Sequence, residues 1–127
     1  PKFIKAALLD QPIVVYGTGK QTRCFADVSD VVDALIKLMN TPKCVGEIFN
    51  VGNTESISIE DLAKKVKEMC DSKSRIEYIS YEEAFEEGFE DMMNRMPCLD
   101  KVKEYIGYEP KYNLDNIICR MIEYYEK

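Results

Sequence analysis

The segment Val14–Phe25 (V-V-Y-G-T-G-K-Q-T-R-C-F) constrains the fold near the start of the chain. It contains a turn with two glycines between two short runs of strand-forming residues. Valine, isoleucine, threonine and aromatic residues favour extended backbone, so Ile13–Tyr16 and Thr22–Phe25 are predicted strands. The two glycines between them predict a tight turn, because glycine adopts backbone angles that other residues avoid. We therefore expect a hairpin that presents one aromatic ring, Tyr16, and one guanidinium, Arg23. This pair suits a ligand with both a flat ring and an anionic group.

The rest of the chain alternates helical and strand patterns. Apolar residues recur every three or four positions in the helical segments, and short β-branched runs separate these segments. Ser58, with an aspartate three positions later, forms an acidic variant of the capping box, and Gly107 stops a short helix. The predicted elements are helix 2–9, strands 13–16 and 22–25, a helix capped by Asp27 or Ser29 and closed at Thr41–Pro42, strand 47–51, a helix after Ser58, strand 75–79, helix 99–106 and a last helix after Asn113.

The predicted helices each carry an apolar side. The acidic segment Tyr81–Met96 is instead predicted to be a helical turn followed by a loop. Together the patterns predict an α/β fold over residues 1–127, a small mixed domain of short strands and about four to five helices. The predicted core sides are Val28, Val31, Val32, Leu35, Ile36, Leu38 and Met39 on the helix after Asp27, and Leu114, Ile117, Ile118, Met121, Ile122 and Tyr125 on the last helix.

Composition excludes several classes of partner. The chain has 127 residues, an apolar fraction of 46% and a formal net charge of −6. Binding to nucleic acid needs clustered lysine and arginine, so this charge argues against a nucleic-acid partner. No apolar run approaches the ~20 residues of a membrane-spanning helix, and no secretory signal pattern opens the chain.

Five cysteines are scattered without a C-x-x-C pair, and there is no histidine. A zinc site needs such close ligands, so no metal site is expected. An odd number of cysteines fits poorly with a disulfide framework, and reduced thiols are typical of the cytoplasm. Without histidine, a Ser-His-Asp triad or a Cys-His dyad cannot be built from this chain, and any catalysis would need carboxylates, lysine or tyrosine.

The Gly17-x-Gly19 turn does not fit a dinucleotide-binding loop. Such a loop reads G-x-G-x-x-G between a strand and a helix, with an acidic residue about 20 positions later. Here the third glycine is absent and a predicted strand follows. We therefore expect no cofactor-binding residues in this turn.

The segment P-I-V-V-Y-G-T-G-K-Q-T-R-C-F-A-D-V-S-D-V-V-D-A-L resembles the extended short-chain dehydrogenase/reductase family, the NAD-dependent nucleotide-sugar epimerases, dehydratases and decarboxylases. The similarity continues in G-E-I-F-N-V-G, in I-S-I-E-D-L-A, in R-M-P-C-L-D-K-V-K-E-Y-I-G-Y-E-P-K and in R-M-I-E-Y-Y. These motifs come in the family's order and span nearly the whole chain. They match only the C-terminal, substrate-binding part of such an enzyme.

The resemblance implies roles for four residues. Arg23 matches an arginine that contacts the nucleotide diphosphate or ribose, and Arg95 matches a second arginine at the diphosphate. A guanidinium suits this task because its planar fork can bond two phosphate oxygens. Val14 and Tyr16 match residues that pack near the base. The family commonly has aspartate where this chain has Cys98, which puts one polar contact to the ligand in doubt.

The family's NAD-binding Rossmann domain and its catalytic Tyr-x-x-x-Lys pair have no match in the chain. Tyr16 and Lys20 have the right spacing, but a Gly-Thr-Gly turn separates them, whereas the family's pair lies on a helix. No catalytic residue is therefore assigned. Since the chain starts at Pro1, directly on a helical pattern, we expect it to be cut from something longer.

The resemblance thus implies a nucleotide-sugar-binding domain, residues 1–127, of a cytoplasmic epimerase (an isomerase) or dehydratase (a lyase). The substrate would be a UDP- or dTDP-linked sugar, and NAD would be bound by the rest of the parent enzyme. We expect the chain alone to be inactive, to bind no NAD, and to expose an apolar docking face for the missing Rossmann domain through which it can self-associate. The sequence leaves the reaction type, the sugar and the base open.

Other interpretations stay open beside these. Arg23 could bridge structurally to Asp27 or Asp30, and Arg95 could neutralise the acidic residues of Glu86–Asp91. Tyr16 could simply fill a half-buried strand position. The acidic run from Glu82 to Asp91 favours a solvated face over a catalytic carboxylate pair at Glu82/Glu83 or Glu86/Glu87. The alternative function is a free-standing module that binds a partner protein with the same fold.

Overall fold

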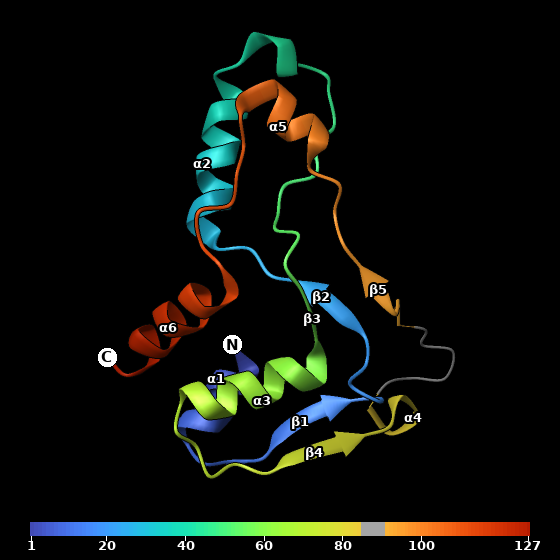
Figure 1. Cartoon of the computed structure of the whole chain (residues 1–127), viewed down its shortest axis with the longest axis vertical. Helices are drawn as coiled ribbons and strands as arrows, with labels where there is room; N and C mark the ends of the chain where they lie inside the picture. Colours follow the sequence, from blue (N-terminus) through green and yellow to red (C-terminus); the bar gives the residue numbers. More distant parts are fainter. Residues whose placement is uncertain (85–90) are drawn as a thin grey trace. The chain divides into compact units, whose positions relative to one another are not determined.

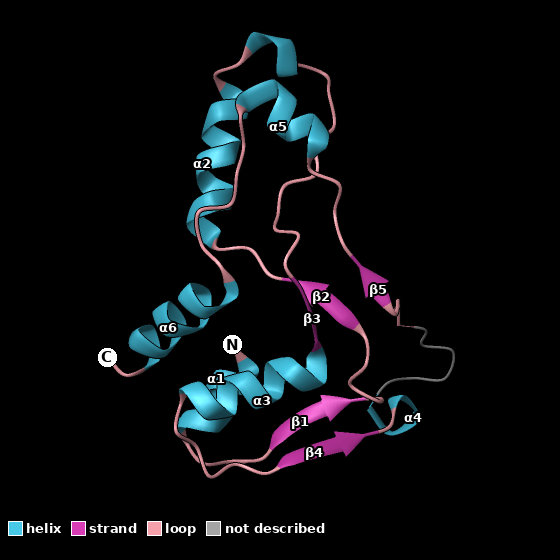
Figure 2. Ribbon diagram, viewed as in Figure 1, coloured by secondary structure: helices cyan, strands magenta, loops and turns pink. Residues whose placement is uncertain are grey.

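The computed structural model describes residues 1–84 and 91–127 of the chain (Figure 1). The chain divides into two units. The first unit comprises Pro1–Arg23, Ile57–Arg95 and Ile118–Lys127, and the second comprises Cys24–Ser56 and Met96–Ile117. The fold class is α/β, as predicted: within the described residues there are six α-helices and several short strands (Figure 2).

The first unit is built on two parallel strands. β1 (Ile13–Tyr16) pairs with β4 (Ile76–Ile79) in a register that places Ile13 beside Ile76. Helices α1 (Lys2–Leu8) and α3 (Ile59–Met69) contact β1 and each other (Figure 1). Burying these apolar side chains is the main source of the unit's stability. The buried apolar residues of these elements are Ile4, Ala7, Ile13, Val15, Ala63 and Val66.

A second small sheet carries the predicted arginines. Its strand order is β3 (Ser56–Ser58), β2 (Thr22–Cys24) and β5 (Asn94–Arg95). β2 runs parallel to β5, and the register places Arg23 beside Arg95.

The predicted hairpin is wrong, because β1 and β2 belong to different sheets. Both glycines of the turn have left-handed backbone angles, as predicted, with φ of +67° at Gly17 and +71° at Gly19. The polar groups around the turn are bonded elsewhere, however. The Gly17 N–H donates to the Ile79 carbonyl of β4, and the Gly19 carbonyl accepts from the Glu60 N–H of α3. These bonds direct the turn to β4 and α3 instead of folding β2 back on β1.

The second unit contains α2 (Val28–Met39), a short 3-10 helix η1 (Pro42–Cys44) and α5 (Asp100–Ile106). α6 (Leu114–Tyr125) begins in this unit and ends in the first. The core of the second unit is a cluster of Ala34, Val102 and Tyr108, against which Leu38, Phe49, Val51, Leu99 and Ile106 pack.

Helix ends follow the sequence closely. The Asp27 side chain accepts a bond from the Ser29 N–H at 2.8 Å, which makes Asp27 the cap of α2. Ser58 Oγ accepts from the Asp61 N–H at 3.0 Å at the start of α3, as predicted. Gly107 ends α5 with a φ of +63°. The predicted core side of α6 is also confirmed, with Leu114 and Ile118 buried.

The predicted core side of α2 is wrong in large part. The buried residues of this helix are Asp30 and Ala34. Ala34 belongs to the core cluster of the second unit, and the Asp30 carboxylate accepts bonds from the Lys111 and Tyr112 N–H groups. The larger apolar side chains of α2 are exposed instead. We call these exposed residues the α2 apolar row: Val28, Val32, Leu35, Ile36 and Met39, with Met39 85% exposed.

Residues 47–51 do not form the predicted strand. Their side chains alternate as a strand requires: Phe49 and Val51 pack on the core cluster, while Ile48 is 86% exposed. A strand also needs a neighbour for its backbone N–H and C=O groups. Among the residues that the structure describes, none forms a ladder with this segment.

The acidic segment behaves partly as predicted. α4 (Tyr81–Ala84) is the expected helical turn, with Glu82 and Glu83 exposed. Short strand β5 was not predicted. Glu86, Glu87 and Glu90 lie outside the described residues. No helix in the described part of the chain is long and apolar enough to span a membrane.

Candidate functional site

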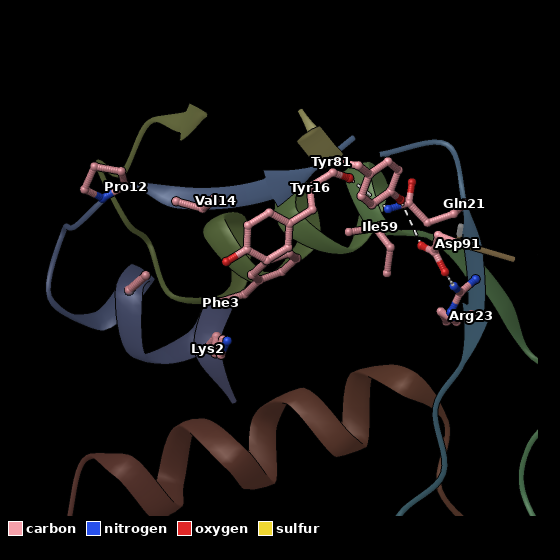
Figure 3. Close-up of a pocket in the computed structure, with 11 residues that line it drawn as sticks. Lys2, Phe3, Pro12, Val14, Tyr16, Gln21, Arg23, Ile59, Tyr81 and Asp91 are labelled. Carbon is pink, nitrogen blue, oxygen red and sulfur yellow. Dashed lines mark hydrogen bonds and ion pairs between the residues drawn. The ribbon is translucent and has the colours of Figure 1, made fainter. Parts of the chain in front are cut away.

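A cavity of about 400 Å³ opens in the first unit (Figure 3). It is lined by three of the four predicted site residues, Val14, Tyr16 and Arg23. Arg95, the fourth, does not line it. The other described residues that line it are Lys2, Phe3, Ala6, Pro12, Gln21, Ile59, Tyr81 and Asp91.

The alternation of strand β1 explains why two of these side chains face the cavity. Ile13 and Val15 are fully buried in the core. Successive strand residues point to opposite faces, so Val14 and Tyr16 lie on the other face, toward the cavity. The first turn of α1 adds Lys2 and Phe3.

The cavity has an apolar part and a charged part. In Figure 3 Pro12 and Val14 lie at one end, and Arg23 with Asp91 lies at the other. The rings of Phe3 and Tyr16 are drawn between the two ends. An elongated ligand with a flat apolar ring at one end and an anion at the other matches this distribution.

Arg23 is held firmly at the charged end. Its Nη1 donates to the Thr22 carbonyl at 2.7 Å and to the Met92 carbonyl at 2.8 Å. Its Nη2 donates to Asp91 Oδ1 in an ion pair in which both side chains are about one-fifth exposed. The carboxylate partner of Arg23 is therefore Asp91, whereas the structural interpretation named Asp27 or Asp30.

The donors of Arg23 are not exhausted by these bonds. A guanidinium has five N–H donors. Three of them have acceptors within residues 1–84 and 91–127: both on Nη1 and one on Nη2. The Nε–H and the second Nη2–H have no acceptor among these same residues. Two donors of one planar fork match two oxygens of one phosphate.

Asp91 is tied to the cavity by a second bond, in which the Tyr81 hydroxyl donates to Asp91 Oδ2 at 2.8 Å. Burial, and then the bond to the Asp91 carboxylate, raises the pKa of Tyr81 above its ordinary value. Tyr81 is therefore a hydrogen-bond donor at neutral pH. Asp91 itself is not part of a solvated acidic face, which corrects the prediction for the end of that acidic run.

The N-terminus of α3 offers no alternative anion site. Helix N-termini bind anions through unpaired N–H groups. Here the Ile59 N–H donates to the Gln21 carbonyl, the Glu60 N–H to the Gly19 carbonyl and the Asp61 N–H to Ser58 Oγ. Because these donors are occupied, the cations of the cavity, Arg23 and Lys2, are the groups suited to an anion.

Arg95 and Cys98 lie outside the cavity lining. Arg95 is exposed on β5 and in register with Arg23 on β2, and side chains paired in this way share one face of the sheet. Its role at a diphosphate stays a prediction. Cys98 is exposed, and its thiol donates to Asp100 Oδ2 at 3.4 Å.

Sequence reasoning missed Lys2, Phe3, Tyr81 and Asp91. Phe3 lies in the predicted helix 2–9, and only the structure shows that Ile4 and Ala7 are buried in the core while Phe3 lines the cavity. Asp91 is 68 positions from Arg23 along the chain, and no local spacing links the two.

A family model described as GDP-mannose 4,6 dehydratase matches residues 1–121. The chain belongs to this family. The match confirms the predicted resemblance to the extended short-chain dehydrogenase/reductase enzymes that act as nucleotide-sugar epimerases and dehydratases.

Three similar proteins locate this dehydratase-family chain among known enzymes. UDP-N-acetyl-α-D-glucosaminuronate decarboxylase of Bacillus cytotoxicus is 37% identical over 127 residues, which is 100% of this chain and 39% of that protein. The crystal structure of UDP-glucose 4-epimerase from Thermotoga maritima with UDP-glucose matches 98% of this chain and 38% of that one, with a TM-score of 0.85 at 26% identity. UDP-glucuronic acid 4-epimerase from Bacillus cereus, in complex with UDP-glucuronic acid and NAD, shares the fold, with a TM-score of 0.85 over 98% of this chain and 38% of that one at 21% identity. The dehydratase-family chain thus spans about two-fifths of the length of these proteins.

Proposed function

We propose that this chain is the nucleotide-sugar-binding part of an NAD-dependent epimerase, dehydratase or decarboxylase, and that it grips the nucleotide diphosphate. The observation that carries the proposal is the cavity of the first unit, which combines an apolar, aromatic part with an arginine that has two N–H donors without an acceptor among the described residues. The similar enzymes named above are described as acting on UDP-linked sugars or as binding them, which supports a UDP-sugar as the substrate.

The ligand would lie along the cavity. The base would pack among Val14, Tyr16 and Phe3, and a phosphate would accept bonds from the Nε and Nη2 of Arg23. Lys2 adds a second positive charge to the lining. Arg95 is proposed as a second diphosphate contact, because its register position beside Arg23 brings two cations to neighbouring strands.

This grip would serve chemistry that takes place elsewhere in the enzyme. Binding energy from the nucleotide, far from the reacting carbon, fixes the sugar in the geometry of the transition state. The chain itself is proposed to carry no catalytic pair. Tyr16 ends β1 and Lys20 follows the glycine turn, so these two residues lack the helical spacing that a Tyr-x-x-x-Lys pair requires.

NAD is implied by the family for the whole enzyme, but the residues described here do not fit it. A dinucleotide needs free N–H groups at a glycine turn that opens a helix. The Gly17–Gly19 turn leads into β2, and its Gly17 N–H is bonded to Ile79. We therefore expect the chain alone to bind no NAD.

The second unit is proposed to pack against the Rossmann domain of the parent enzyme. The α2 apolar row and Ile48 leave an exposed apolar surface, and residues 47–51 alternate in burial but have no ladder partner among the described residues. A parallel sheet in that domain would satisfy both features, because its edge could pair with the segment and its apolar face could be covered by α2.

The five free cysteines support the cytoplasm as the location.

The alternative function, a free-standing interaction module, is favoured by the same exposed row. In that case the α2 apolar row would bind a partner protein or a second copy of the chain. Titration with UDP distinguishes the two functions, because only the nucleotide function predicts that UDP binds, whereas both allow the chain to self-associate. A Leu35→Glu variant should remove any self-association of the 127-residue chain, while UDP affinity stays unchanged if the nucleotide function is correct.

The nucleotide function is tested by calorimetric titration of UDP into the full-length protein and into an Arg23→Ala variant. Losing charge-assisted bonds to one phosphate should weaken binding at least tenfold. Arg75→Ala is the matched control, since Arg75 is exposed and does not line the cavity. Equal UDP affinity in the Arg23→Ala variant and the wild type would remove the diphosphate role. Turnover of a UDP- or dTDP-sugar by residues 1–127 alone would contradict the missing catalytic pair.

A further inference from the structure

Asp91 places a negative charge inside the cavity that the proposed function assigns to an anion. Its carboxylate accepts a bond from Nη2 of Arg23, which is one of the two nitrogens that the proposed function assigns to the phosphate. Among the described residues that line the cavity, the charged ones are Lys2, Arg23 and Asp91. One of the two positive charges is therefore already matched by a carboxylate from the chain itself.

Arg23 does not need this carboxylate to be held in place. The Thr22 and Met92 carbonyls accept both Nη1 donors, at 2.7 and 2.8 Å. These backbone bonds fix the plane of the guanidinium. The contact with Asp91 thus adds charge to the site more than it adds orientation.

We propose that Asp91 competes with the ligand's phosphate for Arg23 and so sets the affinity of the cavity for anions. This inference rests on the proposed nucleotide function. A carboxylate and a phosphate are the same kind of partner for a guanidinium, and two anions beside one half-buried cation repel each other. Binding a diphosphate would therefore weaken or break the Arg23–Asp91 ion pair.

Tyr81 would hold Asp91 in this competing position. Its hydroxyl donates to Asp91 Oδ2 at 2.8 Å, and Tyr81 lines the cavity as well. Without this bond the carboxylate gives way to a phosphate more easily. Removing the hydroxyl should thus act in the same direction as removing the charge of Asp91, with a smaller effect.

Calorimetric titrations of the full-length protein test the inference. Asp91→Asn keeps the size of the side chain and removes its charge, and Tyr81→Phe removes only the hydroxyl. We expect UDP and inorganic pyrophosphate to bind about fivefold more tightly to the Asp91→Asn variant than to the wild type. For the Tyr81→Phe variant we expect a smaller gain in affinity. Uridine, which has no phosphate, should bind all of the proteins alike. Glu68→Gln is the control, because it removes an exposed carboxylate of α3 that does not line the cavity.

The sign of the change decides the outcome. If the Asp91→Asn and Tyr81→Phe variants both bind UDP as tightly as the wild type or more weakly, the proposed competition is overturned. The proposed function still stands in that case, as long as the wild type binds UDP and the Arg23→Ala substitution weakens this binding. If the wild type itself binds no UDP, the proposed function fails and this inference fails with it.

Discussion

The Arg23 guanidinium bonds a carbonyl one residue away and two groups that lie 68 and 69 positions along the chain. Arg23 can be predicted from the sequence because a lone guanidinium beside a glycine turn is a local pattern. Asp91 was counted with a solvated acidic run, because nothing local links it to β2. Arg23 and Asp91 come together because β2 pairs with β5, which follows Asp91 closely in the chain. Local chemistry can thus propose a site residue, but its partners depend on tertiary pairing.

At Gly17 a single methyl group should disturb the site. A Cβ at this position would lie 2.7 Å from Cζ of the Tyr81 ring, in a left-handed backbone with a φ of +67°. Gly46, with a φ of +80°, has no atom of the described residues within 4 Å of the added Cβ and provides the matched control. In urea denaturation we expect Gly46→Ala to cost about 1 kcal/mol from the backbone alone and Gly17→Ala to cost at least ~2 kcal/mol, because Tyr81 must also move. Equal losses would show that Tyr81 does not pack on this turn.

At the scale of elements, helices were predicted well and strand pairing was not. Caps such as Asp27, Ser58 and Gly107 lie within a few residues of the ends that they set, so the sequence contains the whole signal. A strand depends instead on a partner far along the chain. The sequence pattern therefore predicts that β1 pairs with β2, whereas the structure pairs β1 with β4. Residues 47–51 likewise form no ladder in the described part of the chain.

The cap of α3 gives a prediction at this scale. Ser58 Oγ accepts from the Asp61 N–H at 3.0 Å and donates to Asp61 Oδ2 at 2.7 Å. Ser58→Ala should lower the free energy of unfolding by about 1 kcal/mol, because one N–H of the helix start loses its partner. Ser56→Ala, two positions earlier on the exposed start of β3, should change it little. The two urea midpoints give the comparison, and an equal loss in both variants would argue against the cap.

For the whole molecule, the exposed α2 apolar row is the feature that helical periodicity could not place. The pattern showed correctly that the helix has an apolar side, and it assigned that side to the core of the same domain. In the structure the small residue Ala34 meets the core, while the larger residues are exposed. A periodic pattern shows that a face must be covered, but it does not show by which part of a protein.

The dependence of stability on pH is a second property of the whole chain. Hydrogen bonds from the Lys73 N–H and then from Ser72 lower the pKa of Asp10, and ion pairs with lysines lower the pKa values of Asp33, Glu60 and Glu109. Groups with lowered pKa values stabilise the fold above their ordinary values of 3.8 and 4.5, and this contribution is lost as the pH falls below them. Urea midpoints should therefore decline below about pH 4.

The alkaline limb has the opposite sign. Burial raises the pKa values of Tyr78, Tyr81 and Tyr108 above 10.0, so the unfolded chain ionises first as the pH rises. Stability is therefore complete below pH 10 and declines above it. Asp10→Asn should flatten the acid limb and leave the alkaline limb unchanged. A midpoint that rises on going from pH 7 to pH 3 would contradict these assignments.

The central claim is that the cavity of the first unit binds a nucleotide diphosphate through Arg23. A crystal structure of the full-length protein with UDP tests it most directly. We predict phosphate oxygens within about 3 Å of the Nε and Nη2 of Arg23, with the uracil ring packed among Val14, Tyr16 and Phe3. A UDP molecule bound elsewhere, with the cavity empty and Arg23 in contact with no phosphate, would contradict the claim.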